Sequence, residues 1–198
     1  MYDIRACSVA GCENTAVLDE DTCYDHLSDP KTFTRRLLSE LQTSKLLEDA
    51  DLSGVVFSDV DFSGVSMSGC RFSGARFDRC TLSHAYVDFC VFDHARFAGC
   101  RVTAANIRNS VFGASILEDC DYSGSDIIQC TWNGAFCTRV TFDDSDLLHS
   151  RFIAAQISDS SFRNCNLKAV HFQHSSRTDV SFKYSNSEDA LFESEVPW

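Results

Sequence analysis

The sequence lacks several features that identify large classes of protein. No run of apolar residues approaches the ~18 that a membrane-spanning helix requires. The first residues show no basic stretch followed by an apolar one, so we predict no signal peptide and a cytoplasmic location. The chain also contains no G-x-x-x-x-G-K-[ST], no H-E-x-x-H and no G-x-S-x-G motif. We therefore predict that it is neither a membrane protein nor an enzyme.

Positive charge is also scarce. The 198 residues include 17 Lys and Arg against 29 Asp and Glu, which gives a formal net charge of −12. Direct binding of nucleic acid relies on clustered basic side chains that contact phosphates, so this balance disfavours it. A protein partner with a basic surface, or one that itself binds DNA, suits the charge better.

A period of five residues dominates the chain. From Ala50 to Ser194 the sequence divides into 29 consecutive units of five without an insertion. The first position is Ala, Val, Cys or Ser in every unit, and the third is large and apolar in 26 units, the exceptions being Cys137, Arg177 and Ser187. Neither the 3.6-residue period of a helix nor the 2-residue period of a strand explains this pattern. A fixed short period with a turn in each unit indicates a solenoid.

Four units make a square coil of 20 residues, in which inward side chains stack on the same positions one coil away. At the strand spacing of ~4.8 Å, about seven coils give a rod of roughly 34 Å. The longest expected column of inward side chains contains Leu52, Phe72, Phe92, Phe112, Trp132, Phe152, Phe172 and Phe192. The cysteines at first positions are predicted to be buried packing residues rather than disulfides, because free Cys behaves as a small hydrophobe.

This repeat resembles the pentapeptide-repeat family, whose consensus is A-(D/N)-L-x-x. The unit ADLSG at Ala50–Gly54 matches the consensus, and ANIRN and CNLKA match it closely. The resemblance covers residues 50–194 and implies an all-β solenoid, a right-handed quadrilateral parallel β-helix.

The first residues do not follow the repeat and suggest a metal site. Cys7 and Cys12 are separated by four residues, Cys23 and His26 by two, and a ten-residue loop joins the pairs. Two such pairs can supply a tetrahedral Cys3His site, and thiolates with imidazole suit zinc. The segment resembles short zinc knuckles that begin with C-x-x-x-G-C and end with C-x-x-H. Four protein ligands leave no open position, so we predict structural zinc; the alternative is three unligated thiols and a surface histidine.

A helix is expected between this segment and the repeats. Asp29 and Pro30 form a good N-cap and first-turn pair, and Phe33, Leu37, Leu38 and Leu41 follow at helical spacing. We predict a helix over 30–43 that covers the exposed core of the first coil, with partner binding as the alternative role. The predicted layout is a zinc-knuckle-like segment (1–28), a capping helix and linker (29–49), the repeats (50–194) and a tail (195–198).

The opposite end of the rod has no comparable cap. Arg177 and Ser187 interrupt the inward columns there, so we expect loose final coils. Leu191, Phe192, Val196 and Trp198 could fold over this end; alternatively, two open ends could meet in a C2 homodimer, which we favour.

Outward carboxylates are densest on two neighbouring coils. We predict that these carboxylates form a partner-binding surface, with a merely solvated acidic face as the alternative reading. The residues are Glu118, Asp119, Asp121, Asp126, Asp143, Asp144 and Asp146.

The family resemblance implies a second candidate function. Some members of the family mimic duplex DNA and bind DNA gyrase, protecting it from quinolones or inhibiting it. B-DNA carries ~20 charges over ~34 Å. Residues 50–198 contain 19 acidic and 12 basic residues, a net charge of −7, and the repeat has no protruding loop. We therefore predict a non-enzymatic protein–protein interaction module that presents an acidic face, with the gyrase-binding DNA mimic as the alternative.

Overall fold

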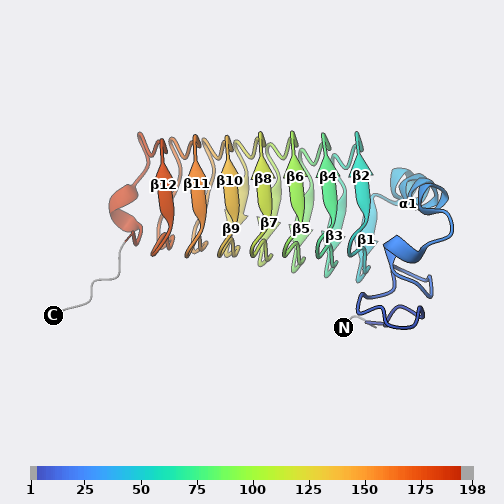
Figure 1. The fold of residues 1–198 in the computed structure, drawn as a ribbon. Coiled ribbons are helices and arrows are strands. Elements are labelled where there is room, and N and C mark those ends of the chain that lie inside the picture. Colours follow the sequence, from blue (N-terminus) through green and yellow to red (C-terminus); the bar gives the residue numbers. More distant parts are fainter. Residues whose placement is uncertain (1–3, 193–198) are drawn as a thin grey trace.

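The computed structural model describes residues 4–192, and it is a rod of stacked coils with a small appendage at one end (Figure 1). The chain turns four corners per coil, so equivalent residues are 20 positions apart. Two faces of the rod are parallel sheets, and the other two are rows of isolated parallel bridges such as Arg71↔Val91 and Thr81↔Arg101. The predicted quadrilateral parallel β-solenoid with a capping helix is confirmed.

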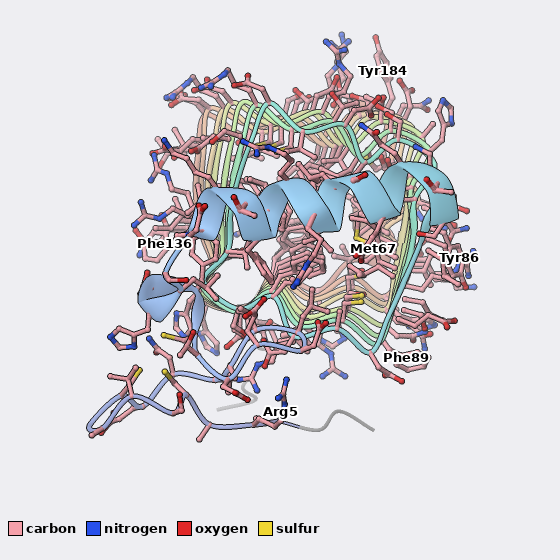
Figure 2. The ribbon with its side chains drawn as sticks, turned by 90° about the vertical axis from the view of Figure 1, so that its right-hand side faces the viewer. Arg5, Met67, Tyr86, Phe89, Phe136 and Tyr184 are labelled. Atoms are coloured by element: carbon pink, nitrogen blue, oxygen red, sulfur yellow. The ribbon has the colours of Figure 1, made fainter. Side chains whose placement is uncertain are left out.

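The short strands follow one another every ten residues and alternate between two opposite faces. The five-stranded sheet contains β1 (Leu46–Glu48), β3 (Ser66–Ser68), β5 (Tyr86–Asp88), β7 (Asn106–Arg108) and β9 (Asp126–Ile128). The seven-stranded sheet contains β2 (Val56–Ser58), β4 (Arg76–Asp78), β6 (Arg96–Ala98), β8 (Ile116–Glu118), β10 (Phe136–Thr138), β11 (Gln156–Ser158) and β12 (Ser176–Thr178). Figure 2 looks along the rod and shows Tyr86 and Phe136 pointing outward on these two opposite sides.

The fifth residue of a unit turns the corner and explains the choice of residues there. At almost every unit this residue has a positive φ, for example 57° at His84 and 54° at Asp119. Gly, Asn, Asp and His tolerate this left-handed conformation better than branched residues do. The backbone conformation at each corner therefore fixes where the outward side chains are placed, whichever residues the sequence has there.

Aromatic rings fill the interior in continuous stacks. Phe72, Phe92, Phe112 and Trp132 stack face to face, with ring centroids 4.8, 4.7 and 3.9 Å apart. Cys137, an exception to the large third position, lies fully buried in the unit that follows the largest ring, Trp132. A small residue there leaves volume for the indole, since interiors are packed to near-crystal density.

Buried Ser and Cys at first positions do more than fill space. The Ser150 hydroxyl donates to the carbonyl of Ile127 at 2.7 Å and accepts from the N–H of Cys130 at 3.0 Å. Cys90 makes the equivalent pair of contacts with longer sulfur distances, 3.5 Å to Met67 O and 3.4 Å from Cys70 N. These side chains join one coil to the previous one, a role that the size argument from sequence did not reveal.

The cap of the rod begins with helix α1 (Pro30–Ser44). Asp29 accepts a hydrogen bond from the N–H of Thr32 at 3.0 Å, as expected of the N-cap residue. Phe33, Leu37 and Leu41 are buried against the first coil, whereas Leu38 is half-buried. Figure 2 shows α1 crossing the end of the coil from the side of Phe136 to that of Tyr86.

The ladder of coils begins earlier than the sequence indicated. β1 pairs in parallel with β3, so the first coil starts at Leu46 rather than at Ala50. The repeat signature is lost there because Lys45, at the first position, is the left-handed C-cap of α1 and has no small inward side chain to supply.

The far end is more exposed but keeps its hydrogen-bonded ladder. Arg177 is only half-buried, and its guanidinium donates to the carbonyl of Phe172 at 3.1 Å and lies over the Phe192 ring. Ser187 begins the short 3-10 helix η2 (Ser187–Asp189). β12 still pairs with β11, so Arg177 interrupts the inward column without breaking the sheet. At Ser187 the 3-10 helix replaces the regular bridge, and Leu167 N donates to the side chain of Asn186 at 2.7 Å. Val196 and Trp198 lie outside the described residues, and the dimer stays a prediction.

No helix within residues 4–192 is long and apolar enough to cross a membrane.

Candidate metal centre and acidic surface

Two tight turns present the four predicted metal ligands. The first turn is closed by hydrogen bonds from Cys7 N to Asn14 O at 3.0 Å and from Cys12 N to Val9 O at 3.1 Å. Gly11 has φ +79° in this turn, a conformation that glycine adopts without strain. The first turn therefore carries the thiols of Cys7 and Cys12.

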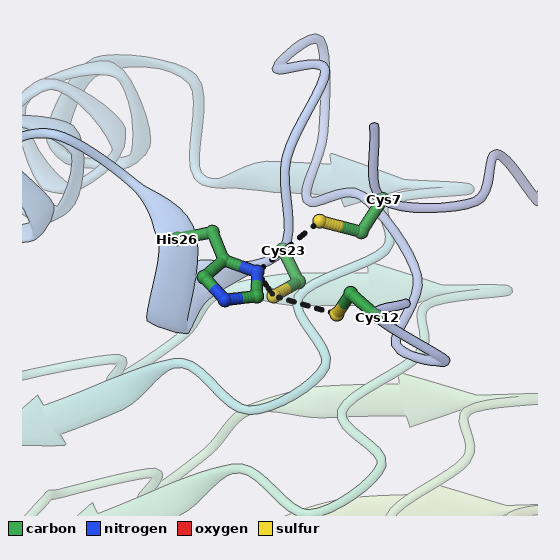
Figure 3. Close-up of side chains that lie close together, drawn as sticks. All are labelled: Cys7, Cys12, Cys23 and His26. Carbon is green, nitrogen blue, oxygen red and sulfur yellow. Dashed lines mark hydrogen bonds between the residues drawn. The ribbon is translucent and has the colours of Figure 1, made fainter. Parts of the chain in front are cut away.

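The second turn is the 3-10 helix η1 (Tyr24–His26). The His26 N–H donates to the carbonyl of Cys23 at 3.0 Å, so the imidazole folds back towards the Cys23 thiol. The two turns bring residues 19 positions apart into contact, as Figure 3 shows.

The four side chains converge on one point. Their ligand atoms lie within 4.8 Å of one another. His26 Nδ1 is 3.4 Å from the thiols of both Cys7 and Cys23, and the Cys12 and Cys23 sulfur atoms are 3.8 Å apart (Figure 3). A tetrahedral zinc ion with Zn–S of ~2.3 Å and Zn–N of ~2.05 Å implies edges of about 3.8 Å between sulfurs and about 3.6 Å between sulfur and nitrogen. The four residues could therefore bind a metal ion, and their spacing fits zinc.

The thiol chemistry of this cluster differs from that of the rod. Burial acts to raise the pKa of Cys7, but the N–H groups of Cys23 and Val9 and the His26 ring outweigh it and lower the pKa to about 6. Burial raises the pKa of Cys130 in the rod to about 12. A thiolate is the metal-binding form of cysteine, so the surroundings of Cys7 favour ligation more than those of Cys130 do.

The segment is attached to the rod by backbone and apolar contacts. Leu18 N donates to the carbonyl of Asp51 at 2.9 Å, and Val17 is fully buried in the common core. The Tyr24 and Phe33 rings meet edge to face with centroids 6.3 Å apart. The predicted ligands are thus held beside the first coil.

The predicted partner-binding carboxylates are distributed over three faces of neighbouring coils. Glu118 and Asp119 belong to the face of β8, and Asp126 belongs to the face of β9. Asp121 lies on the face between these two sheets, where it pairs across coils with Thr141. The structure therefore brings the predicted residues to the same level of the rod, but not to one flat face.

Three of the seven carboxylates are neutralised by arginines. Asp119 accepts two hydrogen bonds from Arg139, at 2.6 and 2.9 Å. Glu118 pairs with Arg96, and Asp126 lies 3.5 Å from Arg108. Sequence reasoning missed these partners, although Asp119 and Arg139 are 20 residues apart and therefore occupy the same position on adjacent coils.

The other four carboxylates accept hydrogen bonds from neutral groups. Asp121 accepts from the N–H of Ser123 at 3.0 Å, and Asp143 accepts from the N–H of Arg163 at 2.8 Å. Asp144 and Asp146 accept from the side-chain amides of Asn164 and Asn166, at 2.7 and 2.9 Å. We call Asp121, Asp143, Asp144 and Asp146 the acidic corner, because within residues 4–192 no ion pair involves them.

Comparison with known families agrees with the repeat. Residues 41–85 match one family model described as pentapeptide repeats (9 copies), and residues 75–113 match another described as pentapeptide repeats (8 copies). Residues 41–113 of the chain are therefore pentapeptide repeats, as the sequence predicted. No curated protein sequence is significantly similar to this pentapeptide-repeat chain.

Several solved structures are similar to this pentapeptide-repeat protein. A trypsin-treated form of QnrB1, a plasmid-mediated fluoroquinolone resistance protein, is 17% identical, with 71% of this chain and 83% of that chain covered and a TM-score of 0.38. HetL, involved in heterocyst differentiation regulation in the cyanobacterium Nostoc sp. strain PCC 7120, is 12% identical, with 84% and 98% covered and a TM-score of 0.35. Rfr23 from the cyanobacterium Cyanothece 51142 is 12% identical, with 80% and 99% covered and a TM-score of 0.32.

Proposed function

We propose that this pentapeptide-repeat protein is a non-enzymatic interaction module whose acidic corner binds a protein with a basic surface. The observation that carries the proposal is the difference between the two groups of carboxylates. Glu118, Asp119 and Asp126 already have arginine partners, whereas the acidic corner has only neutral donors. Its charge is therefore available to a cationic partner, and such complementarity gives specificity and fast association.

The N-terminal ligands suit a supporting role in this function. We propose that Cys7, Cys12, Cys23 and His26 hold a structural zinc ion, which would stabilise a segment too small to fold on its own core. Four protein ligands leave no position for a substrate, which supports a structural rather than a catalytic metal. Eleven cysteines without a disulfide suit a reducing compartment, so we propose the cytoplasm.

The alternative function, a DNA mimic that binds gyrase, needs a dense and uncompensated field of negative charge. The ion pairs made by Arg96, Arg108 and Arg139 reduce that field at the level where the acidic residues are densest. The same ion pairs leave a small acidic patch, which favours a local protein contact over imitation of a duplex.

The test compares capture of partners by matched variants. The corner variant carries Asp121→Asn, Asp143→Asn and Asp144→Asn, which keep the hydrogen-bond acceptors but remove three charges. The control variant carries Asp78→Asn, Asp159→Asn and Asp179→Asn on the face of β2, with the same change in net charge. We expect the wild type and the control variant to capture a partner that salt releases. The corner variant should not capture it. Equal capture by all three would contradict the proposal.

A gyrase supercoiling assay with and without a quinolone tests the alternative directly. Inhibition or protection at micromolar protein, competed by duplex DNA, would favour the DNA mimic. We expect no effect.

A further inference from the structure

The first coil has an outer edge on each of its four faces, and three of these edges have partners. Leu18 N donates to the carbonyl of Asp51 on one face. On the face of β1, the Ser44 hydroxyl donates to Leu46 O at 3.2 Å and accepts from Leu46 N at 3.3 Å. On a third face, Lys45 Nζ donates to Ser63 O at 3.2 Å. Such contacts protect the edge from pairing with another chain.

The fourth edge, that of β2, is open. Arg76 N donates to Val55 O, and Asp59 N donates to Asp78 O, both at 2.9 Å, so the odd-numbered residues around β2 face β4. The N–H and C=O groups of Val56 and Ser58 then point the other way, because backbone direction alternates along a strand. Within residues 4–192 no hydrogen bond reaches them on that side. Figure 1 shows that β2 ends its sheet and that α1 lies beyond it.

A groove lies along this open edge. Its volume is about 840 Å³, and it is lined on one side by Val56, Ser58 and Val60 and on the other by Lys31, Arg35 and Leu38 of α1. A smaller groove of about 310 Å³ shares Leu38, Ser58 and Val60 with it. The larger volume is within the range of ligand sites. Leu38 is the residue of the helical stripe that the core does not bury.

The charges along the groove select the occupant. Lys31 and Arg35 lie on the first two turns of α1, where the helix dipole adds positive potential, and neither is in an ion pair among residues 4–192. The smaller groove is also lined by Asp59, which forms an ion pair with Arg79 at 2.7 Å, and by Asp61, which accepts a hydrogen bond from the N–H of Ser63 at 2.8 Å. A basic wall on a chain of net charge −12 favours negative side chains.

We propose that this groove binds an extended acidic peptide segment of a partner protein, which adds a strand to β2. The open N–H and C=O groups of Val56 and Ser58 would supply main-chain hydrogen bonds, as in other cases of strand addition. Alternate side chains of the peptide would contact Leu38 and Val60, and its carboxylates would face Lys31 and Arg35. The groove lies at the first coil, three coils along the rod from Asp121 of the acidic corner, and the two proposals stand independently.

The test uses a blocked, fluorescein-labelled heptapeptide of alternating Glu and Val. Fluorescence anisotropy with the full-length protein should show saturable binding, and amide hydrogen exchange should slow at Val56 and Ser58. The double variant Lys31→Glu, Arg35→Glu should bind about tenfold more weakly. The control variant Arg151→Glu, Lys168→Glu makes the same charge change far along the rod and should bind like the wild type.

Two further peptides separate the parts of the proposal. A peptide with Lys in place of Glu should not bind; equal binding would overturn the charge selection. A peptide with N-methylated valines keeps its side chains but loses the backbone N–H donors along one edge of the strand. It should also fail to bind. Binding of the Glu peptide without protection of Val56 and Ser58 would overturn strand addition. No binding at millimolar peptide would overturn the whole proposal.

Discussion

In the N-terminal segment, Cys7, Cys12 and Cys23 converge with His26 on one point. In the rod, eight other cysteines are buried at intervals along the coils. The Cys90 thiol, for example, approaches the carbonyls of Met67 and Asp88. With the proposed zinc bound, the first arrangement would concentrate the stability of a small segment in one metal site, whereas the second divides it among many similar contacts. The same residue type should therefore respond very differently to substitution in the two regions.

The largest effect is expected from Cys23→Ser. Because structural zinc contributes about 10–16 kcal/mol to the folding of small zinc domains, loss of one ligand should release the metal and unfold residues 4–27. Zinc content by mass spectrometry and amide exchange measure this, and the far-UV circular dichroism of the rod should persist.

Cys90→Ser is the matched control and should leave the zinc content unchanged. Loss of the rod signal in Cys23→Ser would show instead that the segment and the coils, which the hydrogen bond from Leu18 N to Asp51 O connects, unfold as one unit.

The next effect concerns the rod core. Trp132 is fully buried and stacks between Phe112 and Phe152. Trp132→Ala should lower the free energy of unfolding by about 3–5 kcal/mol, measured by urea denaturation. Trp132→Phe should cost less, because the indole N–H has no hydrogen-bond partner among residues 4–192 and its loss leaves nothing unpaired. Similar losses in both variants would argue against this account.

A smaller loss of stability is expected when a side chain that joins two coils is removed, and it should differ between a hydroxyl and a thiol. Ser150→Ala leaves the Ile127 carbonyl and the Cys130 N–H without their partner and should cost about 1–3 kcal/mol. Cys90→Ala should cost less, because sulfur forms the weaker hydrogen bonds. If both substitutions cost the same, the first position would be explained by size alone.

The smallest effect is expected at an exposed ion pair. The hydrogen bonds and charge of Arg139 hold the pKa of Asp119 below its ordinary value. The contact is therefore fully formed above the ordinary carboxyl pKa and is lost as pH falls through the lowered value. Arg139→Gln should raise the pKa of Asp119, as measured by NMR titration, with little change in stability. An unchanged pKa would show that the pair does not form in solution.

The sequence predicted the coils, the helix and the four converging ligands, because each depends on local spacing. The period of five fixes which side chains point inward, and the Asp29–Pro30 pair sets the start of the helix. The first unit of the first coil, residues 45–49, was missed because Lys45 caps α1 and does not carry the small residue of the repeat. The ion pair of Asp119 with Arg139 joins adjacent coils, and it becomes visible in the sequence only when residues 20 apart are compared.

The four-sided coil also constrains how such a chain can change its length. Insertion or deletion of twenty residues would change the rod by one step of ~4.8 Å and keep every later side chain on its original face. Insertion of five residues would respect the repeat equally well but would rotate everything after it by a quarter turn. The acidic corner would then leave the side of the rod on which Asp121 and Asp143 now lie, although small and large residues would still alternate in the core. Unequal recombination within the repeats can therefore change the direction of an outward surface, at the cost of a new register between the aromatic stacks.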